Sequence, residues 1–115
     1  MTTYQDIEPK ILEMVERTTK LAFMTREEIF DTISAIVALS DELNRYTRQL
    51  DLKIAEAERT AFDSALEKKL SAALTSQAVK QSTSALRADK DWANKQISLL
   101  SEIRIAALAA QRGAE

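Results

Sequence analysis

The chain has 115 residues, and its 16 Lys and Arg side chains face 18 Asp and Glu, which gives a net charge of −2. This balance offers no global electrostatic reason for binding nucleic acid. The chain contains neither Cys nor His, which excludes disulfides, thiolate chemistry and every nucleophile that depends on a His base. We therefore expect a protein that is not an enzyme and that holds no cofactor and no metal.

The scarcity of turn-forming residues predicts the fold class. The chain has one Pro, Pro9, and one Gly, Gly113, so residues 10–112 contain neither. Sheets need turns, and turns mostly use Gly, Pro, Asn and Asp. The interior is instead rich in Ala, Leu, Glu, Lys, Arg and Gln, which favour helices. The composition therefore predicts an all-α protein, and the length predicts a single helical domain over residues 1–115.

The first predicted element is a short N-terminal helix within residues 1–24. Asp6 is placed to cap it, and Pro9 is tolerated in the first turn. Its apolar side chains recur at helical spacing and form one stripe, made of Ile7, Ile11, Met14, Val15 and Leu21. Thr25 and Glu28 then match a capping box, which predicts that a second helix begins there.

The second predicted element is a long helix over residues 25–74. From Ile29 to Ala61 its apolar and small side chains alternate steps of three and four, which is typical of a coiled-coil seam. Phe62, Leu66, Leu70 and Leu74 extend this apolar face. A helix of this length spans roughly 75 Å, so it needs a folded-back partner or another subunit. We predict an oligomer interface formed by Ile29, Ile33, Ile36, Leu43, Leu50, Ile54 and Trp92.

The third predicted element is a C-terminal helix over residues 78–112, with Gly113 as its C′ residue. The hydroxyl-rich residues 75–84 precede and overlap its start, and we place the turn in this stretch, because Ser and Thr compete for backbone hydrogen bonds. The expected architecture is a short N-terminal helix plus a long antiparallel helical hairpin, coiled-coil-like and closed by oligomerisation.

Basic side chains flank the predicted turn on both sides, and a hairpin would bring them together as a rim for a nucleic-acid backbone. The candidate nucleic-acid-binding residues are Lys68, Lys69, Lys80, Arg87, Lys90 and Lys95. The alternative is an ordinary solvated surface balanced by Glu67, Asp89 and Asp91. Residues 44–48 also set two Arg beside Tyr46, and here we favour a solvated helix face with the Tyr packed on the edge of the core.

Several short segments between Glu42 and Gly113 resemble the small phage recombination-mediator proteins of the UvsY type. They are Glu56-Ala57-Glu58-Arg59, Ala88-Asp89-Lys90-Asp91, Ser98-Leu99 and Arg112-Gly113. The resemblance implies a cytoplasmic phage protein that forms a ring-like homo-oligomer and binds single-stranded DNA. Such proteins help to load a recombinase onto strands coated by a single-stranded-DNA-binding protein. The family's basic pair in the first long helix falls here near Ser64 and Leu66, which are not basic.

Two functions remain open from the sequence. The first is a non-enzymatic oligomeric accessory protein for single-stranded DNA, as the resemblance implies. The second is a structural or protein-binding helical module, such as a scaffold, adaptor or small inhibitor, that acts through coiled-coil contacts. The N-terminus shows no signal-peptide pattern, and the most apolar stretch, residues 29–39, contains Asp31 and is too short to span a bilayer. We therefore expect a cytoplasmic location and no membrane partner.

Overall fold

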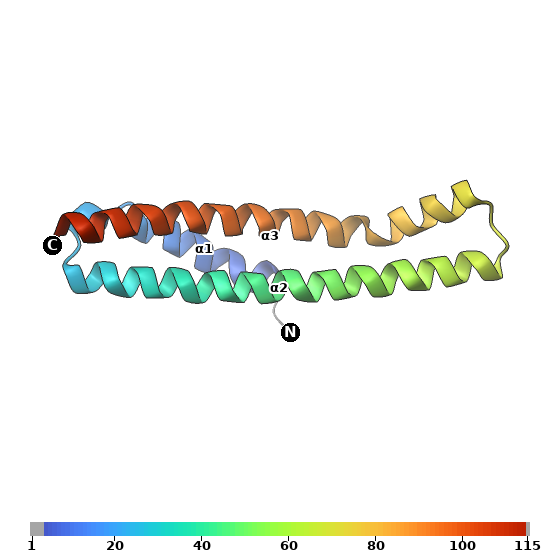
Figure 1. Cartoon of the computed structure of the whole chain (residues 1–115), viewed down its shortest axis with the longest axis horizontal. Coiled ribbons are helices and arrows are strands. Elements are labelled where there is room, and N and C mark those ends of the chain that lie inside the picture. Colours follow the sequence, from blue (N-terminus) through green and yellow to red (C-terminus); the bar gives the residue numbers. More distant parts are fainter. Residues whose placement is uncertain (1–3, 115) are drawn as a thin grey trace. The chain divides into compact units, whose positions relative to one another are not determined.

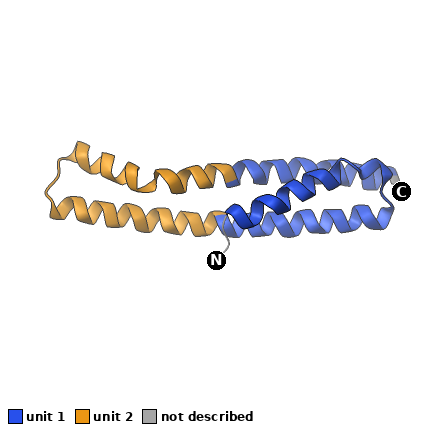
Figure 2. Cartoon of the chain, turned by 180° about the vertical axis from the view of Figure 1, so that it is seen from behind, with its two compact units in different colours: residues 1–46, 93–115 blue, residues 47–92 orange. Residues whose placement is uncertain are grey.

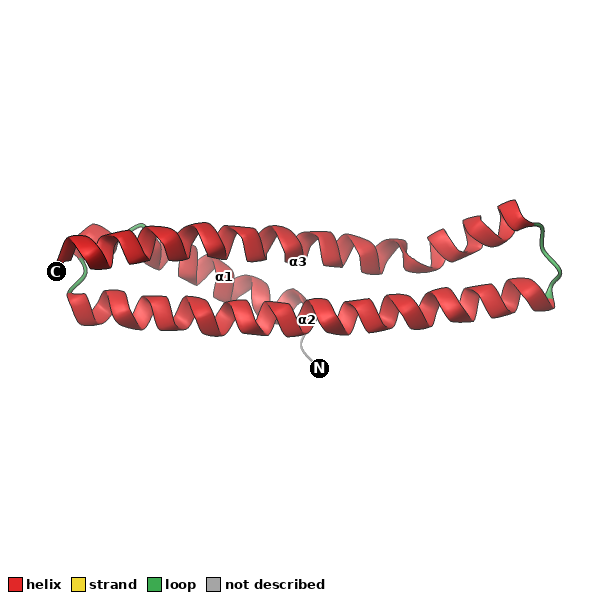
Figure 3. Cartoon of the chain, viewed as in Figure 1, coloured by secondary structure: helices red, strands yellow, loops and turns green. Residues whose placement is uncertain are grey.

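The chain is described by a computed structural model that covers residues 4–114 (Figures 1 and 3). Helix α1 spans Tyr4–Thr18 and is followed by a single 3₁₀ turn at Leu21–Phe23. Helix α2 spans Arg26–Glu67, and helix α3 spans Ala72–Ala114. Residues 4–114 contain no strand, and α2 and α3 pack against each other as a helical hairpin. The predicted all-α class and the hairpin are confirmed.

The helices contribute to two compact units (Figure 2). Unit 1 comprises Met1–Tyr46 and Ala93–Glu115, and unit 2 comprises Thr47–Trp92. The sequence predicts one domain over residues 1–115, whereas contacts divide the chain at the middle of both long helices.

In unit 1, α1 is tied to the first half of α2. It buries Ile7, Ile11 and Met14, three side chains of the predicted stripe, because their spacing places them on one side of the helix. The Lys10 ammonium pairs with the Glu42 carboxylate at 3.0 Å. Asp6 lies in the first turn and not before it, since α1 already includes Tyr4. The helix therefore begins before Asp6, where the sequence placed its start.

The start of α2 follows the predicted capping box. The backbone N–H of Glu28 donates to the Thr25 hydroxyl oxygen at 3.2 Å, which satisfies one of the free N–H groups of the first turn. The Thr25 hydroxyl in turn donates to the Glu28 carboxylate at 3.0 Å. One turn later the buried Thr32 hydroxyl donates to the Glu28 carbonyl at 2.8 Å and accepts from the Arg17 guanidinium at 3.1 Å. This last bond ties the end of α1 to α2.

The predicted seam is the buried side of α2 within the chain itself. In unit 1, Ile29, Ile36 and Leu43 are buried, and α3 adds Leu100 and Ala107 to the same core. The helix runs without a break past Ser40, whose hydroxyl donates to the Ile36 carbonyl at 2.9 Å. A hydroxyl satisfied in this way can occupy a seam position without leaving an unpaired polar group.

The position of the hairpin turn differs from the prediction. Helix α2 ends at Glu67 and not at residue 74. The N–H of Lys69 donates to the Leu66 carbonyl at 3.1 Å, and the N–H of Leu70 donates to the Ala65 carbonyl at 3.0 Å. These two bonds form a Schellman motif. Its C′ residue is Lys69, which adopts a left-handed φ of 53°.

Helix α3 begins immediately after this turn. Ser71 is its N-cap, because the Leu74 N–H donates to the Ser71 hydroxyl oxygen at 3.3 Å. The hydroxyl-rich residues 75–84 therefore lie inside α3, and the prediction that they form the turn is wrong. The Ser82 and Ser84 hydroxyls donate to carbonyls of the preceding turn of α3, so these residues do not interrupt the helix. Such bonds bend helices, and α3 bends in this part (Figure 1).

The C-terminal end of α3 also differs from the prediction. The helix continues through Gly113 to Ala114, and Gly113 does not have a positive φ. Gly113 is therefore a helical residue and not a left-handed C′ residue.

Candidate nucleic-acid interface and grooves of the hairpin end

Unit 2 contains the hairpin end, and its side chains are distributed unusually. Beyond Ile54, the buried or half-buried residues of α2 are small except for Glu58, namely Ala57, Glu58, Ala61, Ser64 and Ala65. The large apolar side chains point outward instead, with exposed fractions of 48% for Phe62, 59% for Leu66, 37% for Leu70 and 51% for Leu74. A contiguous group of exposed large apolar side chains is informative, because soluble proteins seldom leave one without a use.

Two of these side chains form a surface that we call the apolar face. Phe62 and Leu66 project from α2, one helical turn apart. With Leu70 and residues from the start of α3 they line an open groove of about 540 Å³. The α3 residues of this groove are Ala72, Thr75, Ser76, Val79 and Lys80.

A second groove lies on the other flank of α2, and we call it the small-residue groove. It measures about 560 Å³ and is lined by five small side chains and two of opposite charge: Lys53, Glu56, Ala57, Thr60, Ala61, Ser64 and Ser82. Thr60 and Phe62 are two residues apart on α2, which sets their side chains about 160° apart around the helix axis. The two grooves therefore open in different directions.

The six predicted nucleic-acid-binding residues fall into different environments. Lys68 and Lys69 are exposed in the turn between α2 and α3, and Lys80 is exposed at the edge of the apolar face. Arg87 pairs with Glu58, and Lys90 pairs with Asp51, in both cases across the hairpin. These two cations are therefore already balanced by carboxylates within unit 2.

The six residues do not all lie in unit 2. Lys80 and Lys90 are ten residues apart on α3, which corresponds to about 15 Å along its axis. Lys95 belongs to unit 1, where it is exposed. The turn contains both Lys68 and Lys69, whereas the sequence placed it within residues 75–84. The structure therefore reduces the candidate interface to Lys68, Lys69 and Lys80.

The predicted oligomer-interface residues lie mostly inside the chain. Ile29, Ile36, Leu43, Leu50 and Ile54 are buried, while Ile33 and Trp92 are half-buried. The five buried members are core residues of their own chain, so they offer no free surface to a second copy in this structure. The sequence predicts that Phe62 and Leu66 extend the apolar face of the seam, but they lie on a different side of α2 from the buried seam residues.

Tyr46, which the sequence places between two Arg, is buried. Arg45 and Arg48 are exposed on either side of it. This arrangement agrees with the reading of residues 44–48 as a helix face whose Tyr packs on the core. The ring is not available as a platform on which a base could stack.

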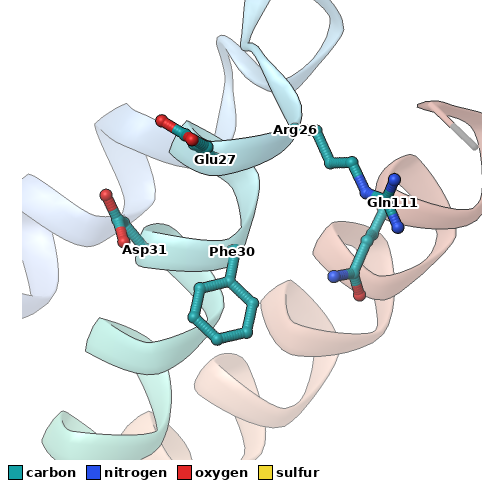
Figure 4. Close-up of a pocket in the computed structure, with 5 residues that line it drawn as sticks. All are labelled: Arg26, Glu27, Phe30, Asp31 and Gln111. Carbon is teal, nitrogen blue, oxygen red and sulfur yellow. The ribbon is translucent and has the colours of Figure 1, made fainter.

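Unit 1 has an open depression between the start of α2 and the end of α3 (Figure 4). Arg26 and Phe30 lie on the side of α2 nearest Gln111, whereas Glu27 and Asp31 point away from Gln111. The polar groups of a ligand site usually converge on one point. The polar groups of this depression do not. Within residues 4–114 no three carboxylates gather closely enough to hold a metal ion, and no helix is long and apolar enough to cross a membrane.

Comparisons with known proteins add no relative. No protein-family model, no curated protein and no solved structure matches the chain.

Proposed function

We propose that the chain is a non-enzymatic, oligomeric accessory protein that binds single-stranded DNA through the lysines of its α2–α3 turn. The observation that carries the proposal is the exposure of Lys68, Lys69 and Lys80 at the hairpin end. No ion pair described in unit 2 involves any of the three, in contrast to Arg87 and Lys90. Ammonium groups of this kind can replace the counterions of a phosphate backbone without reading its sequence.

The resemblance to the UvsY-type mediators supports the same function. It implies that the protein acts in the host cytoplasm and helps to load a recombinase onto strands covered by a single-stranded-DNA-binding protein. Three lysines per chain give weak binding, so the proposal requires that several copies act on one strand and that their contacts sum through avidity.

The test is the fluorescence anisotropy of a labelled single-stranded oligonucleotide, titrated with the protein at several salt concentrations. The double variant Lys68→Glu with Lys69→Glu is compared with a matched control, Lys20→Glu with Arg104→Glu, which changes two exposed cations of unit 1 by the same charge. We expect the turn variant to lose at least about tenfold in affinity. The slope of log K against log salt should fall by about 1.4, or 0.7 for each cation. Equal losses of affinity in the two double variants would mean that the turn lysines are not the DNA-binding site.

A protein-binding helical module is the second candidate, and the exposed apolar face favours it. Such a module would bind the helix of a partner through coiled-coil contacts. Electrostatic affinity is greatest at low salt. If wild-type protein does not bind single-stranded DNA under that condition, the second candidate replaces the first.

A further inference from the structure

The groove at the apolar face has positive charge at both of its ends and apolar side chains between them. Leu70, which lines the groove, follows Lys69 of the turn directly in the chain. Phe62 on α2 and Lys80 on α3 are the lining residues farthest from the turn. Lys80 is also the one charged side chain among the residues that line the groove. An occupant that carries negative charge at its edges and an apolar surface between them fits this layout.

The carboxylates near the groove do not cancel its charge. Glu58 is paired with Arg87 across the hairpin. Asp63 and Glu67 each directly follow a groove residue of α2, which turns their side chains about 100° around the helix axis, and neither lines the groove. Arg59, one turn before the groove, is exposed and adds a further positive charge. The surroundings therefore favour an anionic occupant.

Phe62 gives this groove an exposed aromatic ring, since 48% of the residue is exposed. Bases of a single strand stack on aromatic side chains, and every base can do so because each has a π-face. The groove measures about 540 Å³ and lies within the range of about 300–1,000 Å³ that holds small organic molecules. A base therefore has room beside the ring.

Exposed Phe side chains in unit 1 lack this setting. Phe30 is 59% exposed, but its depression is lined by two carboxylates, those of Glu27 and Asp31, against one cation, Arg26. The excess carboxylate would repel the phosphates on either side of a stacked base. Phe23 also belongs to unit 1, whereas the three lysines of the proposed interface belong to unit 2. Phe62 is therefore the ring that shares a unit and a groove with those lysines.

We infer that the groove at the apolar face is a base-stacking site, in which Phe62 holds an unpaired base of the strand whose phosphates the lysines bind. This role rests on the proposed function and adds to it a group that distinguishes a single strand from a duplex, whose bases are already stacked. Thr75 and Ser76 place hydroxyls in the same groove, and a hydroxyl both donates and accepts. The edges of different bases therefore find a partner, and the site tolerates any sequence.

The first measurement compares two labelled strands of equal length and charge, a thymidine oligonucleotide and an abasic strand whose sugars carry no bases. Phe62→Leu keeps an apolar side chain but removes the ring. By fluorescence anisotropy it is expected to bind the thymidine strand about five- to tenfold more weakly than wild type. Its slope of log K against log salt should be unchanged, because no cation is lost. On the abasic strand the two proteins should have equal affinity.

Two further variants identify the ring as the cause. Phe30→Leu makes the same change at an exposed Phe of unit 1, and its affinity for both strands should equal that of wild type. Phe62→Trp supplies another ring, so it should bind the thymidine strand at least as tightly as wild type. Its added indole emission should fall with the thymidine strand and not with the abasic strand. Wild type, whose one Trp is Trp92, gives the background.

The outcomes separate the stacking site from DNA binding itself. If wild type does not bind the thymidine strand, or if Lys68→Glu with Lys69→Glu binds it as tightly as wild type, the proposed function fails and the stacking site fails with it. If that double variant loses affinity but Phe62→Leu binds both strands as wild type does, DNA binding stands and the stacking site is wrong. Equal losses of Phe62→Leu on the two strands would also overturn it, because the ring would then not contact bases.

Discussion

Lys69 occupies a backbone conformation that is unfavourable for its residue type. Its φ is 53°, and it is the one non-Gly residue within the described range that has a positive φ. The left-handed conformation costs a residue with a Cβ roughly 1–2 kcal/mol. Gly adopts it freely but loses about 0.5–1 kcal/mol more backbone entropy on folding. The difference predicts that Lys69→Gly stabilises the chain by about 0.5–1 kcal/mol.

The assay is thermal unfolding followed by circular dichroism at one fixed protein concentration, since self-association would make the melting temperature depend on concentration. For a chain of this length the expected gain corresponds to an increase in Tm of about 2–4 °C. The gain should also appear in urea as a higher midpoint with an unchanged slope.

Lys68→Gly is the matched control. Lys68 precedes Lys69 in the same turn and is also exposed, but its φ is not positive. Gly brings no relief there and costs about 0.5–1 kcal/mol, so Tm should fall. Both variants remove one lysine from the proposed interface, so both should weaken DNA binding to a similar extent. A Lys69→Gly Tm at or below that of Lys68→Gly would refute the argument from backbone conformation.

Two further variants test the parts of α2 that the sequence predicted. Thr25→Ala removes the hydroxyl that accepts from the Glu28 N–H, and urea unfolding should show a loss of about 1 kcal/mol; an unchanged midpoint would mean that the cap contributes nothing. Leu43→Ala opens a cavity at a side chain that is fully buried in unit 1, and the same assay should show a loss of about 2–5 kcal/mol. A loss below 1 kcal/mol would mean that Leu43 is not a core residue.

The features of the fold that the sequence predicts correctly depend on residues that are close together in the chain. The capping box at Thr25 needs only residues three apart, and the seam needs only regular spacing, so both could be read from one sequence. The turn could not, because its C′ residue is Lys69 and not the Gly that usually marks such a position. Ser71 caps α3, but a single Ser is a weaker signal than the hydroxyl-rich stretch after it, whose hydroxyls bond to carbonyls inside α3.

The candidate site was only partly predictable, for a different reason. Spacing identifies which residues share a side of a helix, but it does not state which of two apolar sides faces the partner helix. Ala57 and Ala61 continue the buried seam, whereas Phe62 and Leu66 lie outside it. Likewise, charge alone does not separate Lys80 from Lys90, whose carboxylate partner on α2 becomes adjacent only in the hairpin.

The proposed DNA interface and the proposed assembly are linked by the salt dependence of binding. If one copy contributes Lys68, Lys69 and Lys80, the slope of log K against log salt is about −2 for a single strand, because each cation adds roughly −0.7. Further copies bound to the same strand add their own turns, and the slope then grows with the number of engaged copies. At a protein concentration where the chain is monomeric, the slope should return to about −2. A slope that remains steep under that condition would mean that further cations of the same chain bind the strand.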